Sequence, residues 1–281
     1  MLLSSQEASA FAGVLFLIFI FGLVGNVLVC LAIYSDRDLR QQYSNYFLFN
    51  LAVTDLLTVT FVIPFCAAAL IQEDWNFGVA WCQITAFVYY SLAIVGLESL
   101  AFISWDRFYA IIHPLKYRAD VTLKKICTAI AFSWFWAVIF TIPCAVLGWF
   151  RYGQYESMLR HQGRRVDTIT SAETPKTSRR HAWRNYYRFK GFRTITLVIV
   201  LFILSWTPFS VTRLIKTVTW NHEIIPASVD TFATVLSLLS TAANPVAYSL
   251  FRKDFRRAFK RLFRQACFCS NKLRRDQTEL E

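Results

Sequence analysis

Residues 81–116 read WCQITAFVYYSLAIVGLESLAFISWDRFYAIIHPLK, and this stretch decides how the rest of the chain is organised. Between Ile84 and Trp105 it holds one charged residue, Glu98, in a run long enough to cross a bilayer. About 20 apolar residues in a helix span the roughly 30 Å of hydrocarbon. The run ends on Asp106-Arg107, where the chain should leave the lipid. Because an arginine at that depth needs a partner or water, we expect the adjacent acid to pair with it.

The composition of the 281 residues favours an all-α integral membrane protein. Hydrophobic residues make up 56% of the chain, which is too apolar for a surface that must face water. The formal net charge is +12, and the basic residues gather at 151–190 and after residue 251, beside apolar runs. Positive charge that faces anionic membrane lipid explains this placement better than nucleic-acid binding does. We therefore expect membrane lipid as a partner and no nucleic acid.

Six apolar runs are long enough to be membrane spans. We predict spans at residues 11–34, 47–71, 82–107, 126–150, 192–218 and 225–250. Residues 1–10 carry no Lys or Arg, so the positive-inside rule favours a short extracellular amino terminus. Pro64 is expected to kink the second span near its outer end. The basic, polar segment 151–191 holds no window that could cross a bilayer, and its composition predicts a disordered loop.

The basic tail, residues 252–281, follows the last span. Aromatic residues recur at helical spacing at positions 251, 255, 259 and 263, and Lys and Arg cover the other face. This pattern is typical of an amphipathic helix that lies on an anionic membrane surface. Cys267 and Cys269 come directly after it, where a palmitoyl chain would add a second anchor. The alternative interpretation of these two residues is a pair of free thiols.

Polar side chains also lie inside the spans. A carboxylate such as Asp55 deep in a membrane helix is a functional hypothesis by default, and the alternative is a protonated, hydrogen-bonded acid. Asn26 either forms a hydrogen bond to another helix or is satisfied by a neighbouring backbone group.

Short motifs recur through the spans in a fixed order. They are Gly25-Asn26, LAVTD at 51–55, Cys82, Asp106-Arg107-Phe108, Trp134, Trp206-Thr207-Pro208 and NPVAY at 244–248. Each motif is weak alone, but together with the amphipathic helix they are highly specific. The chain resembles a rhodopsin-like (class A) G-protein-coupled receptor over about residues 11 to 269. The resemblance implies a seven-transmembrane receptor-type bundle, of which six spanning helices are evident here.

The resemblance implies a role at the inner end of the third span for Asp106, Arg107 and Phe108. In the family the acid holds the arginine at rest, and the arginine engages the G protein when the helices part. Phe108 stands where a tyrosine is usual, so the aromatic ring is kept. Cys82 matches the cysteine that the family pairs with one in its second outer loop.

The resemblance also implies a polar core in the middle of the bundle. Asn26, Asp55 and Asn244 match the residues that hold water or a sodium ion, and Tyr248 matches the tyrosine that swings inward on activation. Gly96 stands where a serine often completes the sodium site. The resemblance therefore leaves sodium binding at Asp55 open.

A ligand pocket is implied around Tyr89, Trp206, Pro208 and Phe209, with Trp206 and Pro208 as the toggle of a kinked helix. Ser205 replaces the cysteine that usually precedes this tryptophan. Tyr89 stands where amine receptors of the family keep an aspartate. A cationic amine would lack its usual counter-ion there, so we expect the unknown extracellular ligand not to be a monoamine.

The fifth helix of the family is missing from this sequence. Residues 148–155 resemble the start of the second outer loop, whereas the sequence from Met158 resembles the third inner loop. There is no cysteine between positions 144 and 267, so the partner expected for Cys82 is missing too. Loss of an exon, a splice variant or a faulty gene model is the simplest explanation. Six crossings would put both chain ends on one side, yet the neutral amino end prefers the outside and the basic tail the cytoplasm.

Two functions follow from the sequence. The first is a multi-pass receptor of the plasma membrane that passes the signal of an extracellular ligand to a heterotrimeric G protein, without a cofactor or enzymatic activity. The second is a truncated receptor without signalling activity that is retained in the endoplasmic reticulum or associates with a full-length receptor as a dimer. A six-helix channel or transporter has the right number of helices, but a filter-like loop and an internal repeat are missing.

Overall fold

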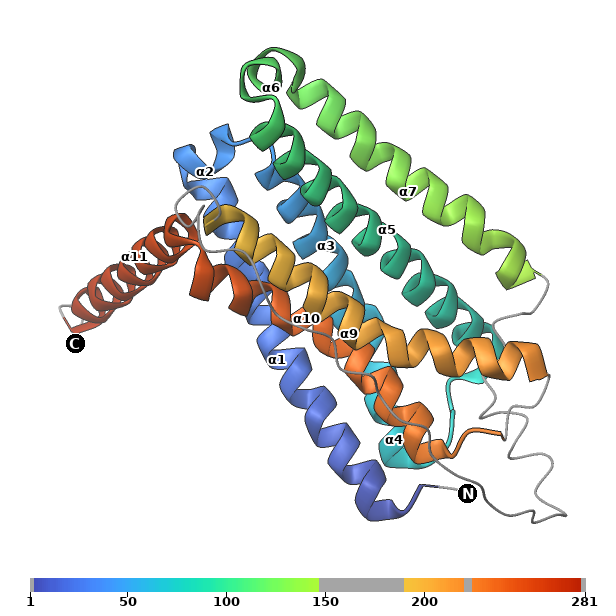
Figure 1. Cartoon of the computed structure of the whole chain (residues 1–281). Coiled ribbons are helices and arrows are strands. Elements are labelled where there is room, and N and C mark those ends of the chain that lie inside the picture. Colours follow the sequence, from blue (N-terminus) through green and yellow to red (C-terminus); the bar gives the residue numbers. More distant parts are fainter. Residues whose placement is uncertain (1–2, 147–189, 220–223, 279–281) are drawn as a thin grey trace, which may run out of the picture.

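The computed structural model describes residues 3–146, 190–219 and 224–278, which are almost entirely helical (Figure 1). The helices are α1 (Ser5–Ser35), α2 (Arg37–Gln41), α3 (Asn45–Phe61), α4 (Ile63–Gln72), α5 (Gly78–Ile112), α6 (Pro114–Asp120), α7 (Leu123–Val146), α9 (Lys190–Thr219), α10 (Ala227–Phe251) and α11 (Lys253–Thr278). Most of the predicted loop 151–191 therefore lies outside the described residues.

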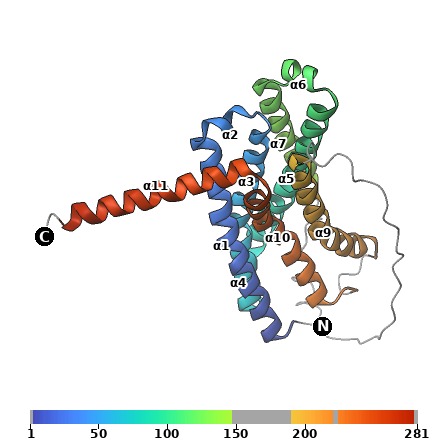
Figure 2. The same cartoon turned by 60° about the vertical axis from the view of Figure 1, so that its left-hand side comes forward.

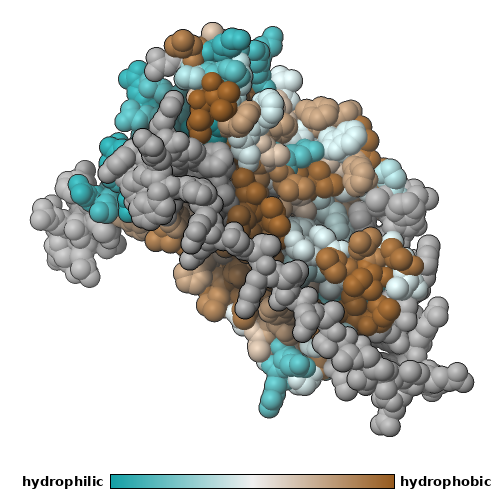
Figure 3. All heavy atoms as spheres, in the orientation of Figure 1, coloured by the Kyte–Doolittle hydropathy of each residue, from teal (hydrophilic) through white to brown (hydrophobic). Residues whose placement is uncertain are grey.

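Six segments of the described chain are long and apolar enough to cross a membrane: α1, α3 with α4, α5, α7, α9 and α10. The predicted second span is divided at Val62, because α3 ends at Phe61 and Pro64 lies in the first turn of α4. Figure 3 shows hydrophobic residues over the middle of the visible face and hydrophilic residues gathered at one end. This distribution is the one expected of helices that cross lipid and are joined by polar segments.

The first helix begins at Ser5, earlier than the predicted span at residue 11. The Ser4 hydroxyl accepts a hydrogen bond from the Glu7 backbone N–H at 3.3 Å, and the Glu7 carboxylate accepts one from the Ser4 backbone N–H at 2.9 Å. Together these bonds form a capping box, which satisfies backbone N–H groups that a helix start leaves without partners. Polar capping thus extends the helix beyond its apolar run.

The helices run between two ends of the bundle, here called the Arg107 end and the Trp75 end. The Arg107 end holds α2, α6, the end of α5 and the start of α11; the Trp75 end holds the start of α1, α4 and the turn after it (Figures 1 and 2). Both α7 and α9 run from the Arg107 end toward the Trp75 end. Hence α7 finishes at the Trp75 end, whereas α9 begins at the Arg107 end.

This parallel pair changes the expected topology. Six crossings should leave both chain ends on one side, but α1 starts at the Trp75 end and α10 finishes at the Arg107 end. The expectation was wrong for this structure because α7 and α9 are consecutive spans with the same direction. The arrangement is that of a bundle with an odd number of crossings from which one helix has been removed.

Two apolar clusters fill the bundle. Toward the Arg107 end, α1, α3, α5 and α10 pack around buried Leu51, Leu100 and Tyr248. Toward the Trp75 end, the same helices with α4 and α9 pack around Leu15, Val59 and others. Since α1, α3, α5 and α10 contribute to both clusters, these four helices form the centre of the bundle.

The last helix is docked onto the Arg107 end. The Phe255 ring is fully buried and lies 5.6 Å from the Tyr248 ring, centroid to centroid. The Arg252 guanidinium donates a hydrogen bond of 3.0 Å to the Asn45 side chain, and Arg261 pairs with Asp36 at 3.2 Å. The prediction of an amphipathic helix after the last span agrees with this placement, although α11 continues to Thr278, past Cys267 and Cys269.

Close packing of α1 on α10 gives a direct test of the fold. A methyl group on Gly25 would lie 2.7 Å and 2.8 Å from the Cβ and Cγ atoms of Pro245, so one helix must move. We expect Gly25→Ala to destabilise the purified chain by about 1–3 kcal/mol, as overpacking does. The measurement is the thermal unfolding midpoint in detergent.

The matched control is Gly13→Ala on the same helix, because no atom lies within 4 Å of a methyl group added there. Alanine stabilises a helix interior by up to about 1 kcal/mol relative to glycine, so this variant should melt at the same temperature or higher. Equal losses in the two variants would contradict the close approach of α1 and α10.

Candidate functional site

The Arg107 end holds a network around the expected acid–arginine pair. The Arg107 guanidinium lies 2.9 Å from Asp106 Oδ2, and the acid is buried. The Tyr117 hydroxyl donates a hydrogen bond of 2.7 Å to Asp106 Oδ1, and the Arg107 guanidinium also donates to the Ser44 hydroxyl. The pair on α5 is therefore tied both to α6 and to the residue before α3. Phe108 is half exposed and lies outside this network.

The network keeps its proton on Tyr117. Partial burial, together with the bond to Asp106 and the charge of that acid, raises the pKa of Tyr117 to about 12. The hydroxyl therefore stays protonated at physiological pH and remains a hydrogen-bond donor to the acid. Tyr117 donates to Oδ1 and Arg107 pairs with Oδ2, so both carboxyl oxygens of Asp106 are in contact with a partner.

The polar core joins α3 to α10. The Asn244 side-chain amide donates a hydrogen bond of 2.8 Å to Asp55 Oδ2, and both residues are buried. The Asn26 amide donates to the Gly22 carbonyl on its own helix at 2.9 Å and to the Thr241 carbonyl on α10 at 2.8 Å. Both interpretations of Asn26 are thus realised by one side chain.

Tyr248 is not part of these hydrogen bonds. Its ring is buried beside Phe255, and its hydroxyl has no hydrogen-bond partner among the described residues. The structure therefore brings Asp55 and Asn244 into contact, and it links Asn26 to α10 one turn before Asn244. The Tyr248 hydroxyl has no hydrogen-bond partner among the described residues.

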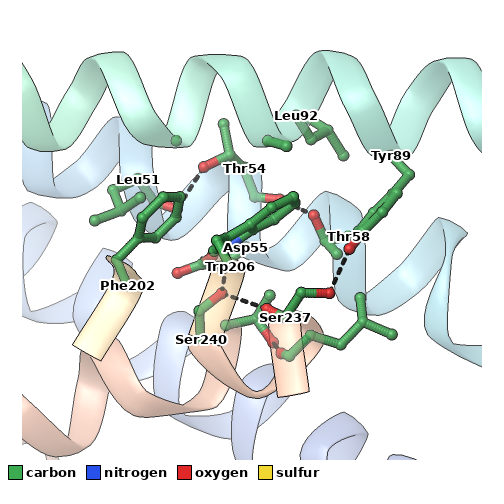
Figure 4. Close-up of a pocket in the computed structure, with 14 residues that line it drawn as sticks. Leu51, Thr54, Asp55, Thr58, Tyr89, Leu92, Phe202, Trp206, Ser237 and Ser240 are labelled. Atoms are coloured by element: carbon green, nitrogen blue, oxygen red, sulfur yellow. Dashed lines mark hydrogen bonds between the residues drawn. The ribbon is translucent and has the colours of Figure 1, made fainter. Parts of the chain in front are cut away.

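A small cavity of about 20 Å³ lies between Asp55 and the rings of Tyr89 and Trp206 (Figure 4). Hydroxyl groups surround it, and they come from α3 and α10: Thr54, Thr58, Ser237, Ser240 and Thr241. Such a volume holds about one water molecule. One carboxylate and several hydroxyl oxygens also suit a small hard cation, but Gly96, which lines the same cavity, supplies no side-chain oxygen. The described residues contain no group of three His, Cys, Asp or Glu that could hold a metal ion.

An aromatic layer covers this cavity. The rings of Tyr89 and Trp206 stack with centroids 5.5 Å apart, and Phe209 stands edge-on to both. The Tyr89 and Ser237 hydroxyls share a hydrogen bond of 2.6 Å, and the Trp206 indole N–H donates to the Ser240 hydroxyl at 3.3 Å (Figure 4). The layer thus links α5, α9 and α10.

Pro208 lies inside α9 between Trp206 and Phe209. A proline removes one backbone hydrogen bond and bends or loosens a helix at that point. The aromatic layer therefore sits beside the point of α9 that is easiest to deform.

The sequence singled out three cysteines, Cys82 as a disulfide candidate and Cys267 and Cys269 as palmitoylation candidates. The Cys82 thiol is free and half-buried at the start of α5. The backbone of Cys267 and Cys269 is helical, and their side chains lie outside the described residues.

Comparison with known proteins identifies the family. The sequence profile described as "7 transmembrane receptor (rhodopsin family)" matches residues 25–162 and 151–248, two pieces that overlap in the polar segment after α7. The chain belongs to the rhodopsin family of seven-transmembrane receptors. This membership confirms the expected all-α receptor-type bundle, of which the described residues hold six candidate spans, and the expectation that the chain is not an enzyme.

Relatives within the family are distant. The chain is 24% identical to the human G-protein coupled receptor 161, over 85% of this chain and 56% of that receptor. It is 27% identical to the rat histamine H2 receptor, over 86% of this chain and 75% of the receptor. It is also 27% identical to the allatostatin-A receptor of Bombyx mori, over 86% of this chain and 76% of that receptor. The chain therefore spans only about half the length of the first of these relatives.

Sequence reasoning missed several partners of the family motifs. Asn50 joins three helices, because its Oδ1 accepts a hydrogen bond of 2.9 Å from the Trp134 indole and its amide donates to Ser99 at 2.9 Å. Tyr117 lies in what reads as a basic loop. The sequence did hold a signal for Asn50 and Ser99, because each is a polar residue that interrupts an apolar run.

Asn50→Ala tests this three-helix junction. The substitution leaves the partly buried indole N–H of Trp134 without its acceptor, which costs up to about 1–3 kcal/mol. We expect a lower thermal unfolding midpoint in detergent. Asn76→Ala is the control, because Asn76 is exposed and bonds only to Gln72 four residues away. If the two variants melt alike, the junction carries no stability.

Tyr117 should make stability depend on pH in the alkaline range. Its folded pKa of about 12 lies above the ordinary value of 10.0, so its contribution is complete below about pH 10 and is lost as the pH rises through about 12. Unfolding midpoints measured from about pH 8 to about pH 11 should fall less steeply for Tyr117→Phe than for the parent chain. Tyr43→Phe, an exposed tyrosine at the same end, should leave the parent's slope unchanged. Parallel curves for all three chains would contradict the bond to Asp106.

Proposed function

We propose that this chain is a receptor that passes the signal of an extracellular ligand to a heterotrimeric G protein. The observation that carries the proposal is the pairing of Arg107 with Asp106 at the end of α5. The same arginine reaches Ser44 before α3, and the acid accepts a bond from Tyr117 on α6. A motif that the family uses for coupling is thus held in a closed arrangement at the end that we assign to the cytoplasm.

The mechanism is a shift between two populations. In the closed state Asp106 and Ser44 hold Arg107 against the bundle. A ligand at the Trp75 end and a G protein at the Arg107 end each favour a state in which α9 has moved and the arginine is released, so each strengthens binding of the other. Pro208 and the aromatic layer beside it couple the two ends, because movement of Trp206 requires α9 to change shape next to the proline.

The ligand that we propose is not a monoamine. The Tyr89 hydroxyl, in the place where amine receptors carry their acid, is buried and bonded to Ser237. The one carboxylate that lines the cavity below is Asp55, which already accepts from Asn244. A histamine receptor is among the relatives. The proposal that the ligand is not a monoamine is nevertheless based on the residues of this chain and not on the relatives' names.

We place the receptor in the plasma membrane with α11 on the cytoplasmic surface. Its basic face would lie on anionic lipid, and palmitoyl chains on Cys267 and Cys269 would anchor it. The docked position of α11, through Phe255 and Arg261, supports this assignment.

A specific observation also favours the second function, a truncated receptor that does not signal alone. The described part of α7 ends at the Trp75 end, α9 begins at the Arg107 end, and the sequence between them is rich in Lys and Arg. Each such residue at the centre of a bilayer costs about 2.5–3.5 kcal/mol on insertion scales. A chain that had to bear this insertion cost would be retained inside the cell, or would act by binding a full-length receptor.

Arg107→Ala decides between the two functions. We expect ligand-independent nucleotide exchange on G proteins, measured in membranes that contain the purified chain, to fall to background in this variant. Arg37→Ala is the control, because Arg37 is exposed at the same end of the bundle.

The second function has its own outcome in this assay. If the parent chain shows no exchange until an apolar helix is inserted between Tyr152 and Arg160, then the chain is a truncated receptor. Unchanged exchange in Arg107→Ala would contradict the coupling role.

A further inference from the structure

We propose that Arg213 and Lys216 on α9 form a binding site for the carboxylate of an organic anion. The site lies where α9 and α10 meet toward the Trp75 end. The inference rests on the proposed receptor function and names the chemical class of its ligand. In the ligand-free state the site is occupied by an acid of the chain itself, Asp230 on α10.

The two cations converge on one oxygen atom. Lys216 Nζ donates a hydrogen bond of 2.8 Å to Asp230 Oδ2, and a terminal nitrogen of Arg213 lies 3.4 Å from the same oxygen. The same nitrogen of Arg213 donates a hydrogen bond of 3.4 Å to the Thr234 hydroxyl on α10. A carboxylate thus already sits between a guanidinium and an ammonium, the pair of groups that recognises carboxylates best.

The site is sheltered but reachable. The side chains of Lys216, Asp230 and Arg213 are 9%, 16% and 23% exposed, respectively. Partial burial weakens screening by water, so charges here interact more strongly than on an open surface. The same shelter makes an unpaired charge costly, so the two cations require an anion whether it is Asp230 or a ligand.

The cations lie beside the aromatic layer. The Arg213 guanidinium is 4.9 Å from the centroid of the Phe209 ring, and that ring packs on Trp206 and Tyr89. A ligand whose carboxylate pairs with Arg213 would therefore bring its apolar or aromatic part against Phe209. The chemical class that fits is a small aromatic or aliphatic carboxylate.

Exchange of one carboxylate for another links binding to movement. When a ligand carboxylate takes the place of Asp230, the cations stay paired but the contact between α9 and α10 is released. α9 carries Pro208 and Trp206 just below this point. Ligand binding would thus free the helix whose movement the proposed function requires.

A cationic amine is the competing ligand, because Asp230 Oδ1 is buried and has no hydrogen-bond partner among the described residues. An ammonium bound to that oxygen would lie close to Lys216 and Arg213, which already contact the other oxygen of the carboxylate. Like charges at such distances repel, so the local charge favours an anion.

Indole-3-acetate and tryptamine test the choice of charge, because the two compounds share one ring system and carry opposite charges. We expect radiolabelled indole-3-acetate to bind the purified full-length chain in equilibrium dialysis, and tryptamine not to bind. Binding of tryptamine, or failure of indole-3-acetate to bind, would overturn the proposal.

Three variants separate a ligand site from a purely structural clamp. Arg213→Gln and Lys216→Gln should each weaken indole-3-acetate binding about tenfold or more, since each removes a charged hydrogen-bond donor. Asp230→Asn should tighten binding, because it removes the resident competitor while keeping a side chain of the same shape. Lys116→Gln, a change of the same type at the exposed Arg107 end, should leave the affinity unchanged.

A structural clamp predicts a different pattern, in which all three variants lose binding and thermal stability together, and that result would also overturn the proposal. The assay contains no G protein, so it is independent of the proposed coupling. Binding without G-protein activation would refute the receptor function and keep the site. G-protein activation that depends on Arg107, in a chain that does not bind indole-3-acetate, would refute the site and keep the receptor function.

Discussion

In the apolar middle of this bundle, a buried polar side chain must find its hydrogen-bond partner within the protein, because lipid offers none. That constraint fixes how the helices face one another. Asn244 turns α10 toward Asp55 on α3, Asn26 holds α1 against the backbone of α10, and Asn50 gathers α3, α5 and α7. Apolar packing alone would tolerate many rotations of a helix in lipid, whereas these bonds allow one.

The same constraint explains why much of the fold follows from the sequence. The spans are long apolar runs, so their number and approximate place can be predicted from hydropathy and length. The residues of the polar core stand out because they are polar where nearly all neighbours are apolar. Helix ends are less predictable, and α1 begins early because of a cap formed by Ser4 and Glu7.

The parts that the sequence did not reveal are partnerships between distant segments. Nothing local to Tyr117 indicates that it bonds to Asp106, and nothing local to Lys216 indicates that it shares an acid with Arg213. Such contacts depend on how the helices are placed. A polar residue in a polar loop does not differ from its neighbours, so the sequence does not single it out. The direction of α9 does not follow from counting crossings, because that count assumes that each connection stays on one side.

The parallel course of α7 and α9 bears on how the chain is made. Membrane helices enter the bilayer one after another as they leave the ribosome, and consecutive helices normally alternate in direction. If the positive charges after α7 hold that segment on the cytosolic side, α7 and α9 cannot both insert in the orientation seen here. Either α7 would fail to integrate, or α9 and α10 would insert upside down and carry the basic tail into the lumen. In that case, biosynthesis of this chain would be a choice between competing topologies.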